Sequence, residues 1–402
     1  MKLDVVADTP VTVLRTPVVW FMALAAALGT ASIYPLQPAI AEVAGALHTS
    51  VAAVGTALAC GPVGYLLGLA LLVPMVDRFV SRTVVSAQFA VLAVALTGCA
   101  AAGSAGVLGA AVGLVGAGAS VGAQLSSVAG RFAPPARRAT VLGIVTAGIS
   151  AGVLAGRIVG GWLTDTMGWR AMLLVFAVGC VVVAAAARFA LPAAPGAATA
   201  SYLETLRRMP GLYARHPALR LAGGRGALWF FAFCTVWAGL AAALSQPPFS
   251  FTPERIGLYA LAGLLGIVAT RISGTWTDRV GARRVILIGL VPAILSTATL
   301  TVSLSNTAIT LICLGLFDAG LFAAQVANQS TVLAIDPAAP ARFNSAYMVV
   351  YFLGGSLGTA FGAAAVDWFG WAATVSLACV STLSAVVVTA VADRRGFGRT
   401  RG

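Results

Sequence analysis

The sequence contains few charged residues for its length. Only 9% of its 402 residues are charged, whereas 59% are hydrophobic and the mean hydropathy is +0.95. A soluble domain averages about 25% charged residues. So small a charged fraction cannot cover a water-facing surface of this size. The composition therefore excludes an ordinary soluble domain and predicts that most of the surface contacts lipid.

Residues and motifs that would support catalysis or metal binding are also scarce. Both histidines lie in loops, and each of the six cysteines stands alone in an apolar run with no CxxC pair, so neither a zinc site nor a disulfide framework is indicated. The sequence lacks a phosphate-binding loop, a nucleophile elbow and paired catalytic carboxylates. We therefore expect no enzymatic activity, no metal and no cofactor.

Long apolar runs dominate what remains. A membrane-spanning helix needs about 20 mostly apolar residues, whereas the strands of a membrane barrel are alternating segments of roughly ten residues. The runs here are long and continuous, so we predict twelve transmembrane helices. They lie near 17–40, 51–75, 83–103, 107–130, 139–162, 170–190, 221–244, 256–277, 285–303, 307–333, 343–366 and 370–391.

The basic residues are distributed unevenly between the predicted loops. With the N-terminus inside the cell and the runs alternating, 21 of the 25 basic residues, Arg225 among them, fall inside. Arg170 and Arg255 fall outside, and Arg157 and Arg271 fall within spans. This bias follows the positive-inside rule and predicts a multi-pass bacterial inner (plasma) membrane protein with both termini cytoplasmic. The net charge of +13 does not indicate nucleic-acid binding, because the basic residues do not gather on one wet face.

The two halves of the chain repeat each other. The pair Asp77-Arg78 follows the second run and recurs 201 residues later as Asp278-Arg279, after the eighth run. A repeat of this length indicates duplication. The chain then divides into an N-terminal six-helix half (1–191), a cytoplasmic linker (192–220) and a C-terminal six-helix half with a basic cytoplasmic tail (221–402).

The repeated Asp-Arg loops suggest a gate. Further arginines follow each copy: Arg82 in the first, and Arg283 and Arg284 in the second. An aspartate at a cytoplasmic helix end can pair with an arginine of a neighbouring helix and can interact with helix N-termini. A duplicated latch of this kind would hold the cytoplasmic face closed in one state. Membrane anchoring alone is the alternative, but it explains only the arginines.

Glycines recur every four residues in the fifth run, which holds Gly148, Gly152, Gly156, Gly160 and Gly161. Small residues on one helix face allow a neighbouring helix to approach closely. Arg157 lies among them in the outer half of the run, where an arginine costs roughly 2–3 kcal/mol unless it pairs or reaches the interface. It either contacts substrate or locks to a carbonyl or carboxylate.

Taken together, the twelve spans, the repeat and the loop GTWTDRVGARR (274–284) resemble the major facilitator superfamily. The stretch GISAGVLAGRIVGG (148–161) is similar to the antiporter motif of that family, with Arg157 in place of its proline. With Trp169-Arg170 after it, the stretch resembles the arabinose-efflux-permease-like branch of drug–proton antiporters. The resemblance implies the major facilitator fold, alternating access and export.

Asp318 is the only carboxylate well inside a predicted span. Intramembrane acids are costly and usually serve proton or ion relays, so we predict that Asp318 couples transport to protons. A structural pair with Arg271 or Arg157 is the alternative. Three amides continue the same helix towards its end, two of them within about 20° of the face of Asp318: Gln325, Asn328 and Gln329.

The resemblance also places spans one, seven and ten at a central cavity. Span one ends in IYPLQP (33–38), where two prolines break the helix. Aromatic and amide side chains in these spans suit small amphiphilic ligands, although an interfacial aromatic belt is the alternative. The predicted cavity residues are Tyr34, Gln37, Gln124, Arg157, Phe233, Trp237, Gln325, Asn328 and Gln329.

We therefore predict an all-α membrane protein of twelve transmembrane helices in two pseudo-symmetric six-helix halves. It would be a monomeric secondary transporter that exports a small amphiphilic drug or metabolite, with the proton gradient as its energy source. Its partners would be the small-molecule substrate and the lipid bilayer, not nucleic acid. A sugar or metabolite permease working as a uniporter or symporter is one alternative. A membrane enzyme or receptor without transport is another, but no catalytic constellation or long sensory domain occurs.

Overall fold

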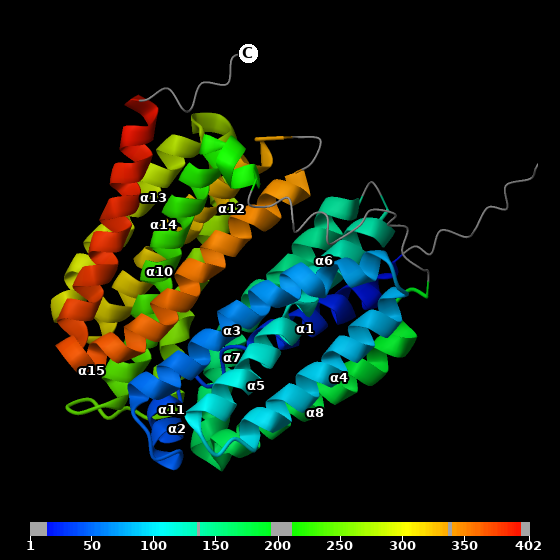
Figure 1. Cartoon of the computed structure of the whole chain (residues 1–402), viewed down its shortest axis with the longest axis horizontal. Helices are drawn as coiled ribbons and strands as arrows, with labels where there is room; N and C mark the ends of the chain where they lie inside the picture. Colours follow the sequence, from blue (N-terminus) through cyan, green and yellow to red (C-terminus); the bar gives the residue numbers. More distant parts are fainter. Residues whose placement is uncertain (1–13, 135–136, 194–210, 337–339, 395–402) are drawn as a thin grey trace, which may run out of the picture.

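The computed structural model describes residues 14–134, 137–193, 211–336 and 340–394. Within these ranges the chain is almost entirely helical, and the helices form two groups that lean against each other (Figure 1). Most of the predicted linker, 194–210, and most of the predicted basic tail, 395–402, lie outside the described residues. The last part of the linker is helical, because α10 begins at Pro217.

The first group holds the helices that precede the linker. They are α1 (Thr16–Ala31), α2 (Ile40–Ala46), α3 (Val51–Leu71), the 3-10 turn η1 (Val73–Asp77), α4 (Ser81–Ala100), α5 (Ala105–Ala119), α6 (Val121–Phe132), α7 (Arg138–Met167) and α8 (Trp169–Ala190). Helix α1 ends before Pro35 and Pro38, as the IYPLQP stretch predicts. Helices α5 and α6 are one apolar segment with a break at Ser120.

The second group follows the linker. It contains α10 (Pro217–Ser245), α11 (Pro253–Leu258), η3 (Tyr259–Gly263), α12 (Leu264–Val280), α13 (Ala282–Ser303), α14 (Thr307–Leu333) and α15 (Pro340–Arg394). Helix α15 is broken at Gly370, whose φ of 77° lies in the left-handed region that favours glycine.

The helices account for twelve membrane crossings. Among the described residues, ten helical segments are long and apolar enough to cross a membrane. One of them, Arg342–Val391, has 50 residues, or about 75 Å of helix. That is more than twice the hydrocarbon thickness of about 30 Å, so the break at Gly370 divides it into two crossings. The shorter apolar helix Thr16–Ala31 is the first crossing, and the predicted fold class is confirmed.

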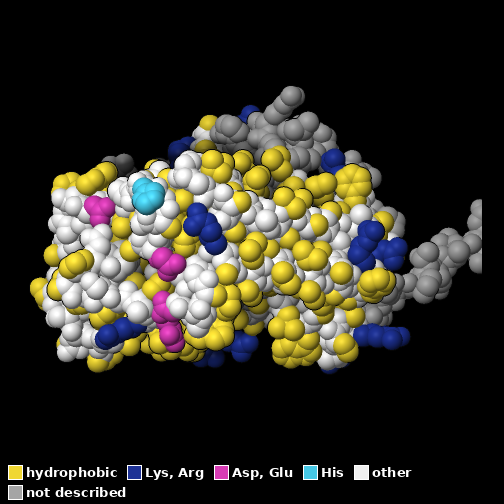
Figure 2. Space-filling view, turned by 90° about the horizontal axis from the view of Figure 1, so that it is seen from below, with side chains coloured by type: hydrophobic (Ala, Val, Ile, Leu, Met, Phe, Trp, Pro, Cys, Tyr) yellow, Lys and Arg dark blue, Asp and Glu magenta, His cyan; other side chains and the backbone are white. Residues whose placement is uncertain are grey.

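Large apolar side chains cover much of the outer surface. Phe189 is 91% exposed, Val302 81% and Leu24 69%, and hydrophobic side chains spread over most of the face seen in Figure 2. Acidic side chains on that face gather in one region. An apolar surface this extensive is stable only against lipid, which is what the composition predicts.

The glycine stripe of α7 packs against the backbone of α1. A Cβ atom added at Gly148, Gly152 or Gly156 would overlap a carbonyl group of α1, so these positions need glycine. The carbonyls belong to Ala23, Ala27 and Ala31, and both sets advance by four residues, so the two helices run parallel. The stripe therefore brings α1 and α7 into direct backbone contact, as its spacing predicts.

The second half repeats this contact with different residues. Gly354, Gly358 and Gly362 of α15 lie against backbone carbonyls of α10, again four residues apart. The carbonyls belong to Ala227, Phe231 and Thr235. Each half thus holds its first and fifth crossings together through a glycine stripe.

The two halves touch each other at one end. A Cβ atom at Gly55 of α3 would overlap Ala363 of α15, and one at Gly161 of α7 would overlap the Pro253 carbonyl of α11. In Figure 1 this is the lower end, near α2 and α11, whereas α6 and α12 lie apart at the opposite end. We call the lower end the closed end.

Candidate functional site

A cluster of five side chains joins the two halves. We call it the Arg157 cluster: Tyr34, Gln37, Arg157, Trp237 and Asp318. The guanidinium of Arg157 lies 4.4 Å above the Trp237 ring and 4.9 Å from the Tyr34 ring, and its Nε donates to Gln37 Oε1 at 2.8 Å. Tyr34, Gln37 and Arg157 belong to the first half, and the other two belong to the second. These five predicted residues therefore form one site.

Asp318 occupies the centre of α14 and is 2% exposed. The indole Nε1 of Trp237 donates to its Oδ1 at 3.1 Å, and an atom added at Gly263 would lie 3.3 Å from its Oδ2. Asp318 and Arg157 both lie in the described part of the chain, and the Asp318 carboxyl forms no direct ion pair with the Arg157 guanidinium. Arg271, the other partner considered, is exposed on α12. The Trp237 indole thus separates the two charged groups.

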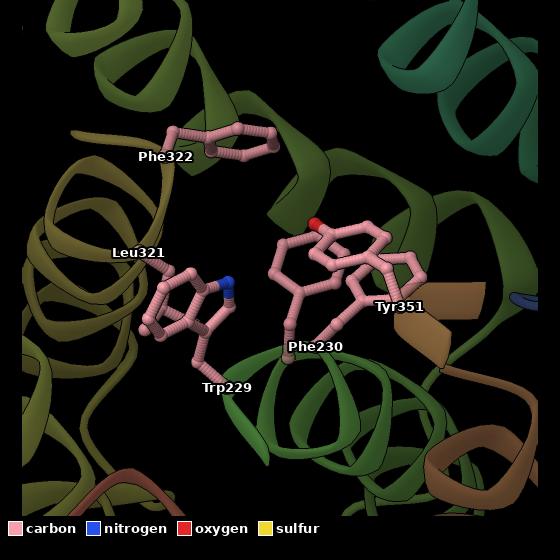
Figure 3. Close-up of a pocket in the computed structure, with 6 residues that line it drawn as sticks. Trp229, Phe230, Leu321, Phe322 and Tyr351 are labelled. Atoms are coloured by element: carbon pink, nitrogen blue, oxygen red, sulfur yellow. The ribbon is translucent and has the colours of Figure 1, made fainter. Parts of the chain in front are cut away.

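An aromatic pocket lies beside this cluster, towards the end where the halves separate. It is partly open, with about 230 Å³ of empty space that includes open solvent, and it is lined by Trp229, Phe230, Phe233, Leu321, Phe322 and Tyr351. The Phe230 and Tyr351 rings stack at 4.0 Å. Figure 3 shows the Trp229 nitrogen and the Tyr351 hydroxyl directed towards the open space between the rings. Of the pocket residues, the sequence predicts only Phe233.

A second polar network borders the pocket on the opposite side from Asp318. Arg225 Nε donates to Asn328 Oδ1 at 2.6 Å, and Asn328 Nδ2 donates to the Tyr347 hydroxyl at 3.2 Å. Tyr347 then donates to Gln325 Oε1, which also accepts from Trp229 Nε1 at 3.3 Å. The network joins α10, α14 and α15. Asn328 is fully buried within it, whereas Gln325 is half-buried.

Arg225 is not in a cytoplasmic loop, where the sequence analysis counts it. It lies inside α10 and is only 6% exposed. The predicted run near 221–244 already contains it, and only the count of basic residues assigned it to the cytoplasm, because it lies close to the start of that run. The signal that would have found it is spacing, since Arg225, Trp229, Phe233 and Trp237 recur every four residues and share one helix side.

The remaining amides of the predicted cavity have other surroundings. Gln329 Nε2 donates to Asn344 Oδ1 at 2.8 Å. Gln124 is fully buried, and its Nε2 donates to the Leu72 carbonyl at the end of α3 at 2.6 Å. Gln124 therefore joins helix ends in the first half and does not line the aromatic pocket.

The predicted gate loops lie at the end where the halves separate. Arg78, Arg82, Asp278, Arg279, Arg283 and Arg284 are exposed, and the side chain of Asp77 lies outside what the structure describes. Arg131 of α6 reaches this region from within the first half, donating to the Val76 carbonyl at 3.1 Å and to Ser81 Oγ at 2.8 Å. The Asp-Arg latch stays a prediction.

Within the described ranges no group of three or more histidine, cysteine, aspartate or glutamate residues could hold a metal ion. The six cysteines are free, and Cys99, Cys180 and Cys313 are buried. Their surroundings are those of small packing residues.

Comparison with known proteins agrees with this architecture. Residues 19–253, more than half of the chain, match the family model of the Major Facilitator Superfamily. The uncharacterized transporter YgaY of Escherichia coli O157:H7 is 28% identical over 380 residues, which cover 94% of this chain and 95% of that protein. The probable transporter SCO4007 of Streptomyces coelicolor is 32% identical over 264 residues, 65% of this chain and 61% of that protein.

Solved structures share the fold at low identity. A bacterial homolog of the human lysosomal transporter Spinster, in an inward-facing and unoccupied conformation, superposes with a TM-score of 0.74 at 16% identity, covering 97% of both chains. The nucleoside transporter NupG gives a TM-score of 0.76 at 12% identity, over 95% of this chain and all of that one (100%). The spans and the bacterial relatives identify a multi-pass inner-membrane transporter and not an enzyme, and the chain belongs to the major facilitator superfamily.

Proposed function

We propose that this transporter exports a small amphiphilic drug or metabolite by alternating access, in exchange for protons carried by Asp318. It works as a monomer with both termini in the cytoplasm. The observation that carries the proposal is the buried carboxyl of Asp318, which lies in the middle of a membrane span and has no direct ion-pair partner among the residues that the structure describes. A buried acid that is not permanently paired can bind and release a proton, which is the usual role of such acids in membranes.

The position of Arg157 gives this proton a way to affect the halves. Arg157 belongs to the first half and Asp318 to the second, and both contact opposite parts of Trp237. An ionised Asp318 attracts the guanidinium across this boundary, whereas a protonated Asp318 does not. Because the halves also touch through the Arg157 carbonyl and Gly257, loss of a proton favours the state in which the closed end is shut.

The cargo would enter through the opposite end. That end carries the exposed arginines of both gate loops, which the positive-inside rule assigns to the cytoplasm. Cargo from the cytoplasm would reach the aromatic pocket first, and Asp318 lies beyond it. Opening of the closed end would then expose Asp318 to external protons and release the cargo outside.

The test is proton movement in inverted membrane vesicles given a panel of amphiphilic compounds. With the intact protein, a transported compound should collapse part of the proton gradient, and Asp318→Asn should abolish that response because the amide cannot release a proton. Glu254→Gln is a matched control: Glu254 is an exposed acid of α11 whose backbone N–H donates to Asp165 Oδ2 and whose side chain has no hydrogen bond within the described residues.

Two results would contradict the proposal. If Asp318→Asn responds like the intact protein, Asp318 is structural and the coupling acid lies elsewhere. If a labelled compound crosses the membrane without any proton movement, the protein is a permease, the alternative that the amide side chains beside the pocket also allow.

A further inference from the structure

We propose that the aromatic pocket binds an organic anion, with a flat ring system between its aromatic side chains and an oxyanion beside Arg225 and Gln325. This names the chemical class of the cargo and rests on the proposed function only in taking the aromatic pocket as the cargo site.

Among the described residues, the charge of Arg225 has no carboxylate paired with it. Its Nε and Nη2 donate to Asn328 Oδ1 and, at 3.4 Å, to Thr331 Oγ1, and both acceptors are neutral. Arg225 is only 6% exposed. Burying a charge to this extent is costly unless an opposite charge accompanies it. A bound anion would supply that charge.

The orientation of the polar network is fixed by its donors. An indole nitrogen can only donate a hydrogen bond, so the Gln325 atom facing Trp229 must be the oxygen. The Tyr347 hydroxyl donates to that same oxygen. The amide nitrogen of Gln325 is therefore directed elsewhere, and among the described residues it has no acceptor.

Three hydrogen-bond donors without a partner lie in or beside the pocket, and of their residues only Tyr351 lines it. Gln325 Nε2, the Tyr351 hydroxyl and Arg225 Nη1 have no partner in the described ranges, and none of them belongs to the buried polar atoms sealed from solvent. The Tyr351 hydroxyl faces the open space of the pocket (Figure 3). The two N–H donors of Arg225 and Gln325, one of them on a guanidinium, suit an oxyanion such as a carboxylate.

The aromatic rings and the distant position of Asp318 also favour an aromatic anion as the ligand. Phe230 stacks on Tyr351 and packs edge-on to Phe352 at 5.5 Å, so the pocket offers flat apolar faces that suit an aromatic body. Arg225 lies about 18 Å along the axis of α10 from Trp237, the residue that donates a hydrogen bond to Asp318. An anion at Arg225 is therefore not repelled by the carboxyl, whereas a cation there would face the guanidinium.

The first experiment is calorimetric titration of the full-length protein in lipid nanodiscs, without a proton gradient. Three ligands share one ring system: 2-naphthoate, neutral 2-naphthamide and cationic 2-naphthylmethylammonium. We expect naphthoate to bind about tenfold or more tightly than the amide, as a charge-assisted hydrogen bond predicts, and the ammonium to bind most weakly. Equal affinities, or tighter binding of the ammonium, would overturn the inference without any variant being needed.

Variants then locate the anion. Arg225→Gln should remove the preference for naphthoate over naphthamide while leaving naphthamide binding in place. Arg188→Gln removes an exposed arginine of α8 and should keep the preference. A preference that survives Arg225→Gln would place the anion elsewhere and refute the assignment.

The two proposals can fail separately. If naphthoate is preferred but no ligand moves protons, the anion site stands and proton coupling is wrong. If other compounds drive proton exchange but naphthoate is not preferred, export stands and the cargo class proposed here is wrong.

Discussion

A single methyl group at the contact between the halves should control how often the closed end is shut. In Gly55→Ala, the new Cβ atom on α3 would overlap the Cβ atom of Ala363 on α15. The next nearest atoms are the Cα atom of Ala363 at 3.6 Å and Cδ1 of Ile40 at 3.9 Å, both ordinary contacts. The clash therefore lies with one methyl group of the opposite half.

The expected size follows from that geometry. Overpacking of a tight contact costs about 1–3 kcal/mol, and the halves can avoid it by separating at this end. The cost then falls only on the state in which the end is shut, whose population relative to the open state should drop about 5- to 150-fold. In the double variant Gly55→Ala with Ala363→Gly, the methyl group moves from one helix to the other. The clash is gone, and the helix preference of alanine over glycine, about 1 kcal/mol, cancels.

The assay is a distance measurement between spin labels on the two halves. Gly45 and Arg255 are exposed at this end, so cysteines there, in a chain without its native cysteines, can carry the labels. The single variant should lengthen the main distance and the double variant should restore it. Gly61→Ala, also on α3, makes only contacts of 3.4 and 3.6 Å within its own half, to Val112 and Ile33, and should change nothing. An unchanged distance in the single variant, or no recovery in the double variant, would refute the reasoning.

Three further predictions concern single residues. Trp237→Phe keeps a ring below the guanidinium but removes the hydrogen-bond donor to Asp318, a charge-assisted bond of about 1.5–3 kcal/mol. Cargo-driven proton movement should therefore fall about tenfold or more, and an undiminished response would show that transport does not use this bond. The new methyl group of Gly152→Ala would overlap a carbonyl of α1, whereas that of Gly143→Ala on the same helix meets nothing within 4 Å. Only Gly152→Ala should lower the thermal unfolding temperature, and equal unfolding temperatures for the two variants would disprove the tight contact. Partial burial raises the pKa of the Glu42 carboxyl above its ordinary 4.5, so ionisation of Glu42 opposes folding. The stability that the protonated carboxyl provides at low pH is lost as the pH rises through the folded-state pKa. Glu42→Gln should remove this pH dependence of unfolding, and identical pH profiles of unfolding for the variant and the intact protein would contradict the prediction.

Several features were predictable because the bilayer restricts the chain so strongly. Hydrocarbon thickness fixes the length of each span, and backbone groups without water must be satisfied within helices, so the apolar runs alone gave the fold class. The glycine stripe of α7 was predictable because a four-residue period places small residues on one helix face, where another backbone can approach. Asp318 stood out because an acid inside a span is costly and therefore rare.

What the sequence determined by itself was thus the set of helices, the duplication and the presence of one intramembrane acid. Only the tertiary structure decided which side chains meet. Gln124 and Gln325 stand 201 residues apart in the two halves, yet the first bonds a helix end at Leu72 and the second lies beside the pocket with Trp229. The physical reason is that a polar side chain takes its role from the helices packed against it, and those contacts join residues far apart in the chain. The Trp237–Asp318 bond spans 81 residues and the Arg157–Gln37 bond 120, and no local pattern encodes either.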